Sequence, residues 1–156
     1  MMIKTIGVIG ESQAKKENYN LAYEVGKLIG ASGAALVCGG LSGVMEAACK
    51  GAKEAGGLTI GIIPMVDKSA ANPYVDLVIP TGIGYARNVV VVRASDAIIA
   101  IGGKYGTLTE LGYALDAGIP IIGLNTWHLK DCNGVVPNIR YVRTAEEAVK
   151  IALSAI

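Results

Sequence analysis

The 156-residue sequence contains no phenylalanine, one tryptophan and one histidine, and only 17% of its residues are charged. Fourteen Lys and Arg residues against thirteen Asp and Glu residues give a net charge of +1. No global field therefore favours nucleic acid or an anionic membrane surface. No apolar run approaches the roughly 18 uncharged residues that a membrane-spanning helix needs, and the N-terminus lacks the regions of a signal peptide. We expect neither nucleic acid nor a membrane as a partner.

Cysteine is also scarce, because the chain has only Cys38, Cys49 and Cys132. Their number is odd, and they show neither C-x-x-C spacing nor the spacing of metal ligands. We therefore expect reduced thiols in a cytoplasmic protein, and no metal site.

The residues that are abundant are aliphatic residues and glycine: 52% of the chain is hydrophobic and 21 residues are glycine. This composition is typical of α/β proteins with buried parallel strands. We predict one Rossmann-like domain over residues 1–156, with a doubly wound, mostly parallel sheet of about six or seven strands and helices on both faces. The low charge also indicates apolar surface that another copy of the chain would cover, so we expect a homodimer or a higher homo-oligomer.

Short apolar runs and helical periodicity alternate along the chain. The predicted strands are Thr5–Ile9, Ala34–Cys38, Leu58–Ile63, Val75–Pro80, Ala97–Ile101, Ile121–Leu124 and Ile139–Val142. The predicted helices are Tyr19–Ser32, Val44–Ala55, Tyr85–Ala94, a segment from Thr107 to Ala117, and Thr144–Ile156. Val89–Val92 has strong β propensity, but a parallel strand at Ala97 needs a crossover before it, so we predict a helix there.

The stretch from Ala97 to Glu110 is the most informative part of the sequence. Its apolar run is followed by Gly102, Gly103 and Gly106, which allow a tight turn. Thr107 would be the N-cap of the next helix, with Glu110 at capping-box spacing. A strand, a glycine turn and a helix N-terminus direct free N–H groups at one point, and such an arrangement binds anions, phosphate above all. We predict the ligand site here, with Lys104 as a further contact to an anion.

A second glycine turn, Gly39–Gly43, follows the second strand and precedes another helix. Two such turns on one parallel sheet would line the same edge, at the carboxyl ends of the strands. The predicted ligand-binding residues therefore include Gly39, Gly40 and Gly43, together with Gly10 and Ser12 after the first strand.

Several side chains have two interpretations. Glu110 is either a capping residue or a functional carboxylate, and Glu46 is either a first-turn helix carboxylate or a ligand contact. Arg87 is either a surface arginine or a site residue at the strand ends. Trp127 could cover the pocket or fix its loop, and His128 has no evident partner as a base or ligand.

These residues resemble the Rossmann-like LONELY GUY (LOG) superfamily, whose signature is Pro-Gly-Gly-x-Gly-Thr-x-x-Glu. The stretch Gly102–Glu110 matches it, Arg87-Asn88 stands where the family has an Arg-Lys pair, and Gly39–Met45 resembles the family's other glycine turn. The resemblance spans essentially the whole chain. It implies a nucleoside 5′-monophosphate phosphoribohydrolase in which Arg87 and Glu110 form the catalytic pair and both glycine turns hold phosphate.

Three positions depart from the signature. Gly102 replaces Pro, Lys104 replaces a glycine, and Asn88 replaces Lys. This pattern is similar to a branch of the superfamily that includes molybdenum cofactor carrier proteins. We therefore predict a small phosphate-bearing ligand, with Asn88 among the residues that bind it and no required catalytic cofactor. Either the ligand's N-glycosidic bond is hydrolysed, or a molybdenum cofactor or nucleotide is bound without turnover.

Overall fold

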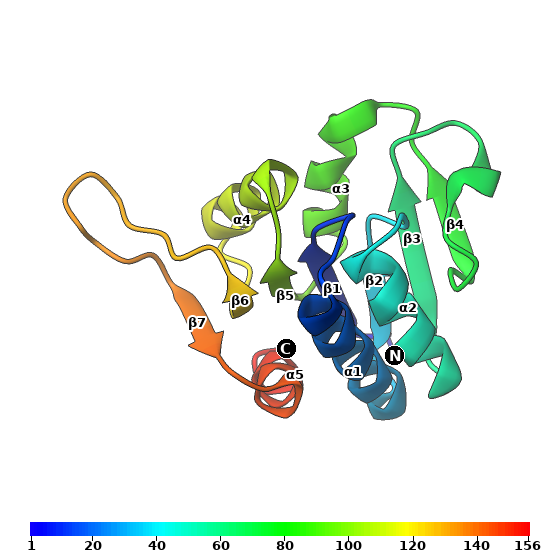
Figure 1. Cartoon of the computed structure of the whole chain (residues 1–156), viewed down its shortest axis with the longest axis horizontal. Helices are drawn as coiled ribbons and strands as arrows, with labels where there is room; N and C mark the ends of the chain where they lie inside the picture. Colours follow the sequence, from blue (N-terminus) through cyan, green and yellow to red (C-terminus); the bar gives the residue numbers. More distant parts are fainter.

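The computed structural model describes residues 1–156, and its centre is a sheet of seven strands that are all parallel. The strand order is β4-β3-β2-β1-β5-β6-β7 (Figure 1). The strands are β1 (Thr5–Gly10), β2 (Ala35–Cys38), β3 (Thr59–Ile63), β4 (Leu77–Pro80), β5 (Ala97–Gly102), β6 (Ile121–Thr126) and β7 (Ile139–Val142). The predicted α/β Rossmann-like class is confirmed.

Helices cover both faces of this sheet. Helices α1, α2 and α5 lie on one face, and α3 and α4 lie on the other (Figure 1). Their bounds are α1 (Lys16–Ser32), α2 (Val44–Glu54), α3 (Arg87–Arg93), α4 (Tyr105–Ala117) and α5 (Ala145–Ser154), with short 3-10 turns η1 (Lys68–Ala70) and η2 (Gly84–Ala86). No helix combines the length and the apolar character that crossing a membrane requires.

The core has two parts, one on each face of the sheet. Successive residues of a strand point to opposite faces, and β5 shows the consequence: Ile99 and Ile101 pack under α1, α2 and α5, while Ile98 and Ala100 pack under α3 and α4. Because β5 is buried along its whole length, it reads in the sequence as an unbroken apolar run.

Several predicted helix starts differ from the structure. Helix α3 begins at Arg87, two residues after the predicted start, because η2 occupies Gly84–Ala86, and α5 begins at Ala145, one residue after the predicted start. Helix α1 begins at Lys16, three residues before the predicted start. Helix α4 begins at Tyr105 with Lys104 at the N-cap position, so the prediction that Thr107 caps this helix in a capping box is wrong. The chain turns into the helix two residues before the predicted cap, because Gly103 adopts a φ of 106°. Thr107 lies buried in the first helical turn.

The prediction for the one segment with conflicting signals is confirmed. Val89–Val92 is helical within α3, and the burial of Val91 and Val92 explains why packing prevails over β propensity. Thr144 caps α5 by accepting a hydrogen bond from the backbone N–H of Glu147. Residues 127–138 form a long loop, which extends away from the body of the molecule (Figure 1).

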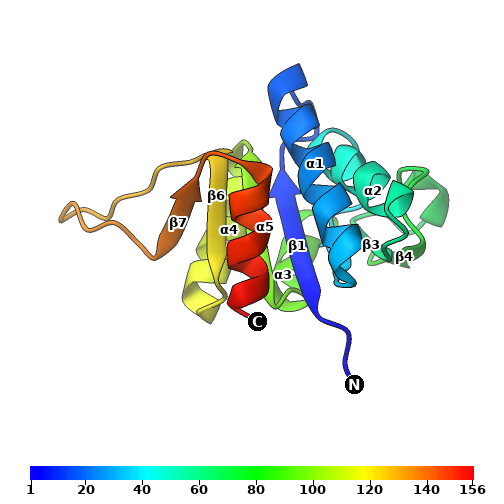
Figure 2. The same cartoon turned by 90° about the horizontal axis from the view of Figure 1, so that it is seen from below.

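The strand order determines where a site can form. β1 lies between β2 and β5, so the loops after these three strands are neighbours at the carboxyl edge of the sheet. Gly10 of β1 pairs in register with Ile101 of β5, so these two strands end together. Both chain termini lie at the opposite edge (Figure 2).

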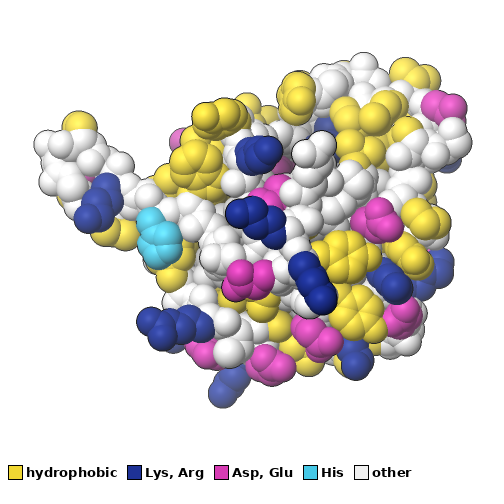
Figure 3. All heavy atoms as spheres, in the orientation of Figure 1, with side chains coloured by type: hydrophobic (Ala, Val, Ile, Leu, Met, Phe, Trp, Pro, Cys, Tyr) yellow, Lys and Arg dark blue, Asp and Glu magenta, His cyan; other side chains and the backbone are white.

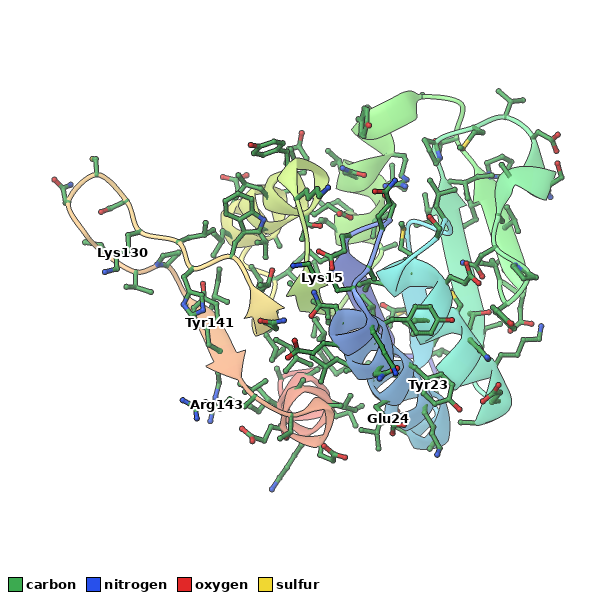
Figure 4. The ribbon with its side chains drawn as sticks, in the orientation of Figure 1. Lys15, Tyr23, Glu24, Lys130, Tyr141 and Arg143 are labelled. Carbon is green, nitrogen blue, oxygen red and sulfur yellow. The ribbon has the colours of Figure 1, made fainter.

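Helices α1 and α2 approach each other closely because small residues form their contact. A Cβ on Gly51 of α2 would lie 2.0 Å from the backbone oxygen of Tyr23 in α1. A Cβ on Gly26 of α1 would lie 1.9 Å from the backbone oxygen of Ala48 in α2. At the rim of this contact the Tyr23 hydroxyl donates a hydrogen bond to Glu54, and Figure 4 labels Tyr23 on α1.

We therefore expect Gly51→Ala to lower the free energy of unfolding by about 1–3 kcal/mol, since the added methyl forces backbone to move. The matched control is Gly112→Ala on α4, where no heavy atom lies within 4 Å of the added Cβ. That control is expected to raise stability by up to about 1 kcal/mol, because alanine is the better helix former. Urea unfolding of both variants is the measurement, and equal effects would contradict the packing argument.

Candidate functional site

A cavity of about 360 Å³ opens at the carboxyl edge of the sheet, where β1 and β5 end. Figure 3 views the molecule from this side and shows basic and acidic side chains interspersed near the middle of the face. Eight of the predicted site residues line the cavity: Gly10, Ser12, Arg87, Asn88, Lys104, Gly106, Thr107 and Glu110. The loops and helix starts thus bring together predicted residues from three separate parts of the chain.

Arg87 begins α3 and is only 8% exposed. Its Nη2 donates to the backbone oxygen of Gly39 at 3.2 Å, and its Nη1 donates to Oδ1 of Asn88. The remaining nitrogen, Nε, is buried and has no hydrogen-bond partner. Burial lowers the pKa of the Arg87 guanidinium, although the negative charge of Glu110 opposes this shift.

Glu110 faces the same cavity from α4 and is 6% exposed. Burial raises the pKa of its carboxyl to about 8, against the lowering effect of the Arg87 charge. Arg87 and Glu110 do not form an ion pair. The chain has one ion pair with a nitrogen–oxygen distance below 4.0 Å, and it joins Lys53 and Asp76. The carboxyl of Glu110 is therefore mostly uncharged at neutral pH, with its hydrogen-bonding capacity directed at the cavity.

Glu11 connects the two glycine turns across the end of β1. Its backbone oxygen accepts a hydrogen bond from Val44 at the start of α2 at 3.0 Å. Its carboxylate accepts one from the backbone N–H of Gly103 at 2.8 Å and one from the side chain of Asn18 at 2.8 Å. Burial alone would raise the pKa of Glu11, but these hydrogen bonds and the charge of Lys104 together lower it. The two turns do lie near each other, with an anionic side chain between them.

Most glycines of the two turns do not line this cavity, although Gly106 does. Gly39, Gly40 and Gly43 are not part of the lining, and the backbone N–H of Gly40 donates to Sγ of Cys38 at 3.2 Å. Gly102 and Gly103 line a neighbouring cavity of about 370 Å³. The N–H of Gly103 is already used by Glu11. The structure thus places these five predicted phosphate contacts around the cavity and not on its surface.

Free N–H groups are instead provided by the first turn of α4. The first helical backbone bond of α4 runs from the N–H of Leu108 to the oxygen of Lys104 at 3.0 Å. The N–H groups of Tyr105, Gly106 and Thr107 precede that bond and have no acceptor within the helix. With the exposed side chain of Lys104 beside them, they form the anion-attracting part of the cavity.

Sequence reasoning did not select six further lining residues: Glu11, Gln13, Leu41, Met45, Tyr85 and Tyr105. Tyr85 and Tyr105 are 87% and 78% exposed, so two aromatic rings stand at the rim. Their positions close to Arg87 and Lys104 in the sequence are the signal that could have identified them. Glu11 had a signal as well, because it stands between Gly10 and Ser12.

Of the residues with two interpretations, Arg87 and Glu110 line this cavity, whereas Trp127 and Glu46 do not, and His128 does not either. The indole N–H of Trp127 donates to the backbone oxygen of Lys104 at 3.2 Å. Trp127 lines the neighbouring cavity together with Lys15, the residue before α1, which Figure 4 labels. His128 stacks on Tyr141 with ring centroids 4.2 Å apart. Glu46 is half-buried in the first turn of α2. No group of three or more His, Cys, Asp or Glu residues is arranged to hold a metal ion.

The fold and the site define a class: Rossmann-like α/β proteins with a polar cavity at the carboxyl ends of a parallel sheet. The chain belongs to the SLOG cluster4 family, whose sequence model matches residues 3–151. The resemblance identified from the signature residues is thereby confirmed.

Comparisons with individual proteins point in two functional directions. A protein of Archaeoglobus fulgidus is 43% identical over 155 residues, covering 99% of this chain and 98% of that protein. The cytokinin riboside 5′-monophosphate phosphoribohydrolase of Mycobacterium tuberculosis is 34% identical over 125 residues, covering 74% of this chain and 67% of that protein.

Among solved structures, the molybdenum cofactor binding protein of Rippkaea orientalis superposes with a TM-score of 0.89 at 36% identity, covering 99% of this chain and 98% of that one. The molybdenum cofactor carrier protein of Chlamydomonas reinhardtii gives a TM-score of 0.86 at 31% identity, with 99% and 98% covered. This chain is thus similar both to phosphoribohydrolases and to molybdenum cofactor carriers.

The burial of Glu110 predicts a pH-dependent stability. In the unfolded chain a glutamate loses its proton near pH 4.3, whereas folded Glu110 keeps it up to about pH 8. Between these values the folded state binds more protons, so stability falls as pH rises, by up to about 1.4 kcal/mol per pH unit. Glu110→Gln removes this loss.

We therefore expect the melting temperature of Glu110→Gln to rise relative to the unmodified protein between pH 5 and about pH 8. Above that range the difference should level off. Asp116→Asn, which removes an exposed carboxylate from the same helix, corrects for general effects of charge. A difference that stays constant across this range would contradict a buried, protonated carboxyl.

Proposed function

We propose that the cavity binds a small ligand that carries a phosphate group and a planar heterocycle. One observation carries this proposal: Arg87 and Glu110 are both buried, form no ion pair with each other, and face one cavity with unused hydrogen-bonding capacity. Buried polar groups without partners are costly. A ligand between them would supply the missing partners.

The two parts of the cavity match the two parts of such a ligand. Lys104 and the N–H groups at the start of α4 favour an anion, and Arg87 adds a second positive charge. The apolar part consists of Leu41, Met45, Tyr85 and Tyr105, against which a flat ring can pack.

The first candidate function, based on Arg87 and Glu110 as a catalytic pair, is hydrolysis of an N-glycosidic bond in a nucleoside 5′-monophosphate. With its raised pKa, Glu110 in the protonated form donates its proton to the departing base as the C–N bond breaks. The resulting carboxylate stabilises the positively charged sugar and orients a water molecule, which adds to the sugar carbon and returns a proton to Glu110. Arg87 binds the phosphate or stabilises the departing base.

A second function is favoured by a separate observation. The two molybdenum cofactor proteins resemble this chain over nearly its full length. The departures from the LOG signature also distinguish this chain from that signature. Gly102 stands where the signature has proline, and its φ of 58° is one that proline cannot adopt. In this alternative the same cavity holds a phosphate-bearing pterin, the molybdenum cofactor, as cargo without turnover.

Binding predicts stabilisation by the ligand and a role for Lys104. At 100 times its dissociation constant, a ligand raises the free energy of unfolding by roughly 2.7 kcal/mol, which appears as a higher melting temperature. Lys104→Gln should weaken this effect for phosphate-bearing compounds, whereas Lys68→Gln, an exposed lysine on η1 that does not line the cavity, should not. Thermal melts with a panel of nucleoside monophosphates and free cofactor are the measurement. Equal responses of both variants would exclude Lys104 from the binding site.

Turnover separates the two functions. Hydrolysis predicts release of free base from one of the nucleoside monophosphates, with the release lost in Glu110→Gln while the fold is retained. The carrier function predicts stabilisation without base release and a pterin bound to freshly purified protein, detectable by native mass spectrometry. Base release that persists in Glu110→Gln would exclude Glu110 as the proton donor.

We also propose that the chain forms a homodimer and works in the cytoplasm. Exposed apolar side chains on β4 and in the following loop, Leu77, Ile79 and Ile83, support a surface covered by a second copy. The three cysteines, which lack C-x-x-C and metal-ligand spacing, support a reducing compartment.

A further inference from the structure

Asn88 is the second residue of α3 and is only 3% exposed. Both ends of its side-chain amide are used inside the protein. Oδ1 accepts a hydrogen bond from Nη1 of Arg87, and Nδ2 donates one to Oγ1 of Thr109 at 3.1 Å. The amide therefore joins the arginine to a residue of α4.

The orientation of this amide follows from its neighbours. Arg87 has only donors, so it must face the amide oxygen. The single hydroxyl proton of Thr109 is donated to the backbone oxygen of Gly106 at 2.6 Å, so Thr109 can only accept from Asn88. The hydrogen-bond chain thus runs in one direction, from Arg87 through Asn88 and Thr109 to Gly106 in the first turn of α4.

This chain fixes the guanidinium relative to the rest of the cavity. Gly106, Thr107 and Glu110 all lie on the part of α4 that Thr109 and Asn88 hold. On its other side the guanidinium donates to Gly39 at 3.2 Å. With Nη1 and Nη2 anchored in this way, Nε is the nitrogen without a protein partner.

We propose that Asn88 is a positioning residue, which acts through Arg87 by holding its guanidinium at a set place opposite Glu110 and the first turn of α4. This inference rests on the proposed function, because the placement matters for binding a phosphate-bearing ligand. An amide suits the role because it both accepts and donates. A lysine at this position would have no acceptor for Arg87 and would add a like charge beside it.

The test uses two readouts, one of which needs no ligand. The first is the ¹H–¹⁵N spectrum of the arginine side chains, in which an anchored Arg87 gives resolved guanidinium signals, assigned by their loss in Arg87→Lys. The second is the affinity for adenosine 5′-monophosphate, measured by calorimetry. The variants are Asn88→Leu, which removes both hydrogen bonds at similar volume, and the matched pair Thr109→Val and Thr109→Ser. Thr109 is exposed, so this pair leaves the core intact.

We expect Asn88→Leu to lose the Arg87 signals and to bind the nucleotide roughly tenfold more weakly. Thr109→Val should weaken binding by about threefold, while Thr109→Ser, which keeps the hydroxyl, should match the unmodified protein. Should Asn88→Leu not fold, the threonine pair decides the question. Unchanged Arg87 signals in Asn88→Leu, or equal behaviour of Thr109→Val and Thr109→Ser, would overturn the positioning role. If even the unmodified protein does not bind the nucleotide, the proposed function fails for that ligand, and the spectra still decide the role of Asn88.

Discussion

The burial of Arg87 and Glu110 without direct contact is the constraint on which the site depends. Water no longer stabilises their charges, so the pKa of the carboxyl rises to about 8 and that of the guanidinium falls. A core arranged for stability alone would pair the two groups or replace them with apolar side chains. Here the arginine bonds to Gly39 and Asn88 instead of to the glutamate, and both Arg87 and Glu110 line the cavity. Because the protein leaves these groups partly unsatisfied, a ligand can complete their interactions.

The glycine turns have a structural role in the site, because they allow the backbone contacts that hold its parts together. β1 separates the strands that carry them, and Glu11 at its end bonds to both sides, through its backbone oxygen to α2 and through its carboxylate to Gly103. A Cβ on Gly102 would lie 2.5 Å from the side chain of Asn18 and 2.7 Å from that of Glu11, so glycine provides the room for this contact. The groups that attract an anion are therefore not the glycine N–H groups of the turns but Lys104 and the N–H groups in the first turn of α4. The turns determine where the helix begins, and the helix offers its N–H groups to the cavity.

The fold could be predicted from the sequence because its signals are local. Buried parallel strands give apolar runs, Gly33 and Gly118 end helices in the left-handed conformation, and the need for a crossover identifies α3 despite its four valines. The glycine pattern indicates which sheet edge carries the site, and the resemblance to the LOG superfamily selected Arg87 and Glu110 there. The partner of the Gly103 N–H could not be predicted, since Glu11 lies 92 residues away in the chain. The capping prediction for Thr107 failed for a related reason: the conformation of Gly103 decides the helix start, and spacing alone does not reveal it.

Binding and turnover make different demands on the same carboxyl. A carrier needs only an uncharged hydrogen-bonding group beside its cargo, and a buried glutamate with a pKa near 8 is such a group. A hydrolase must also use the ionised form, so Glu110 has to give up its proton and take one back within each cycle. The ionised form becomes less costly when a positive charge approaches, as it does when a sugar cation develops beside the carboxyl and Arg87 stays in place. Under the carrier proposal, the buried Glu110 already meets this demand. Under the hydrolysis proposal, the ligand must also bring the developing charge within reach of Glu110, so turnover depends on the geometry of the bound sugar as well as on the carboxyl at position 110.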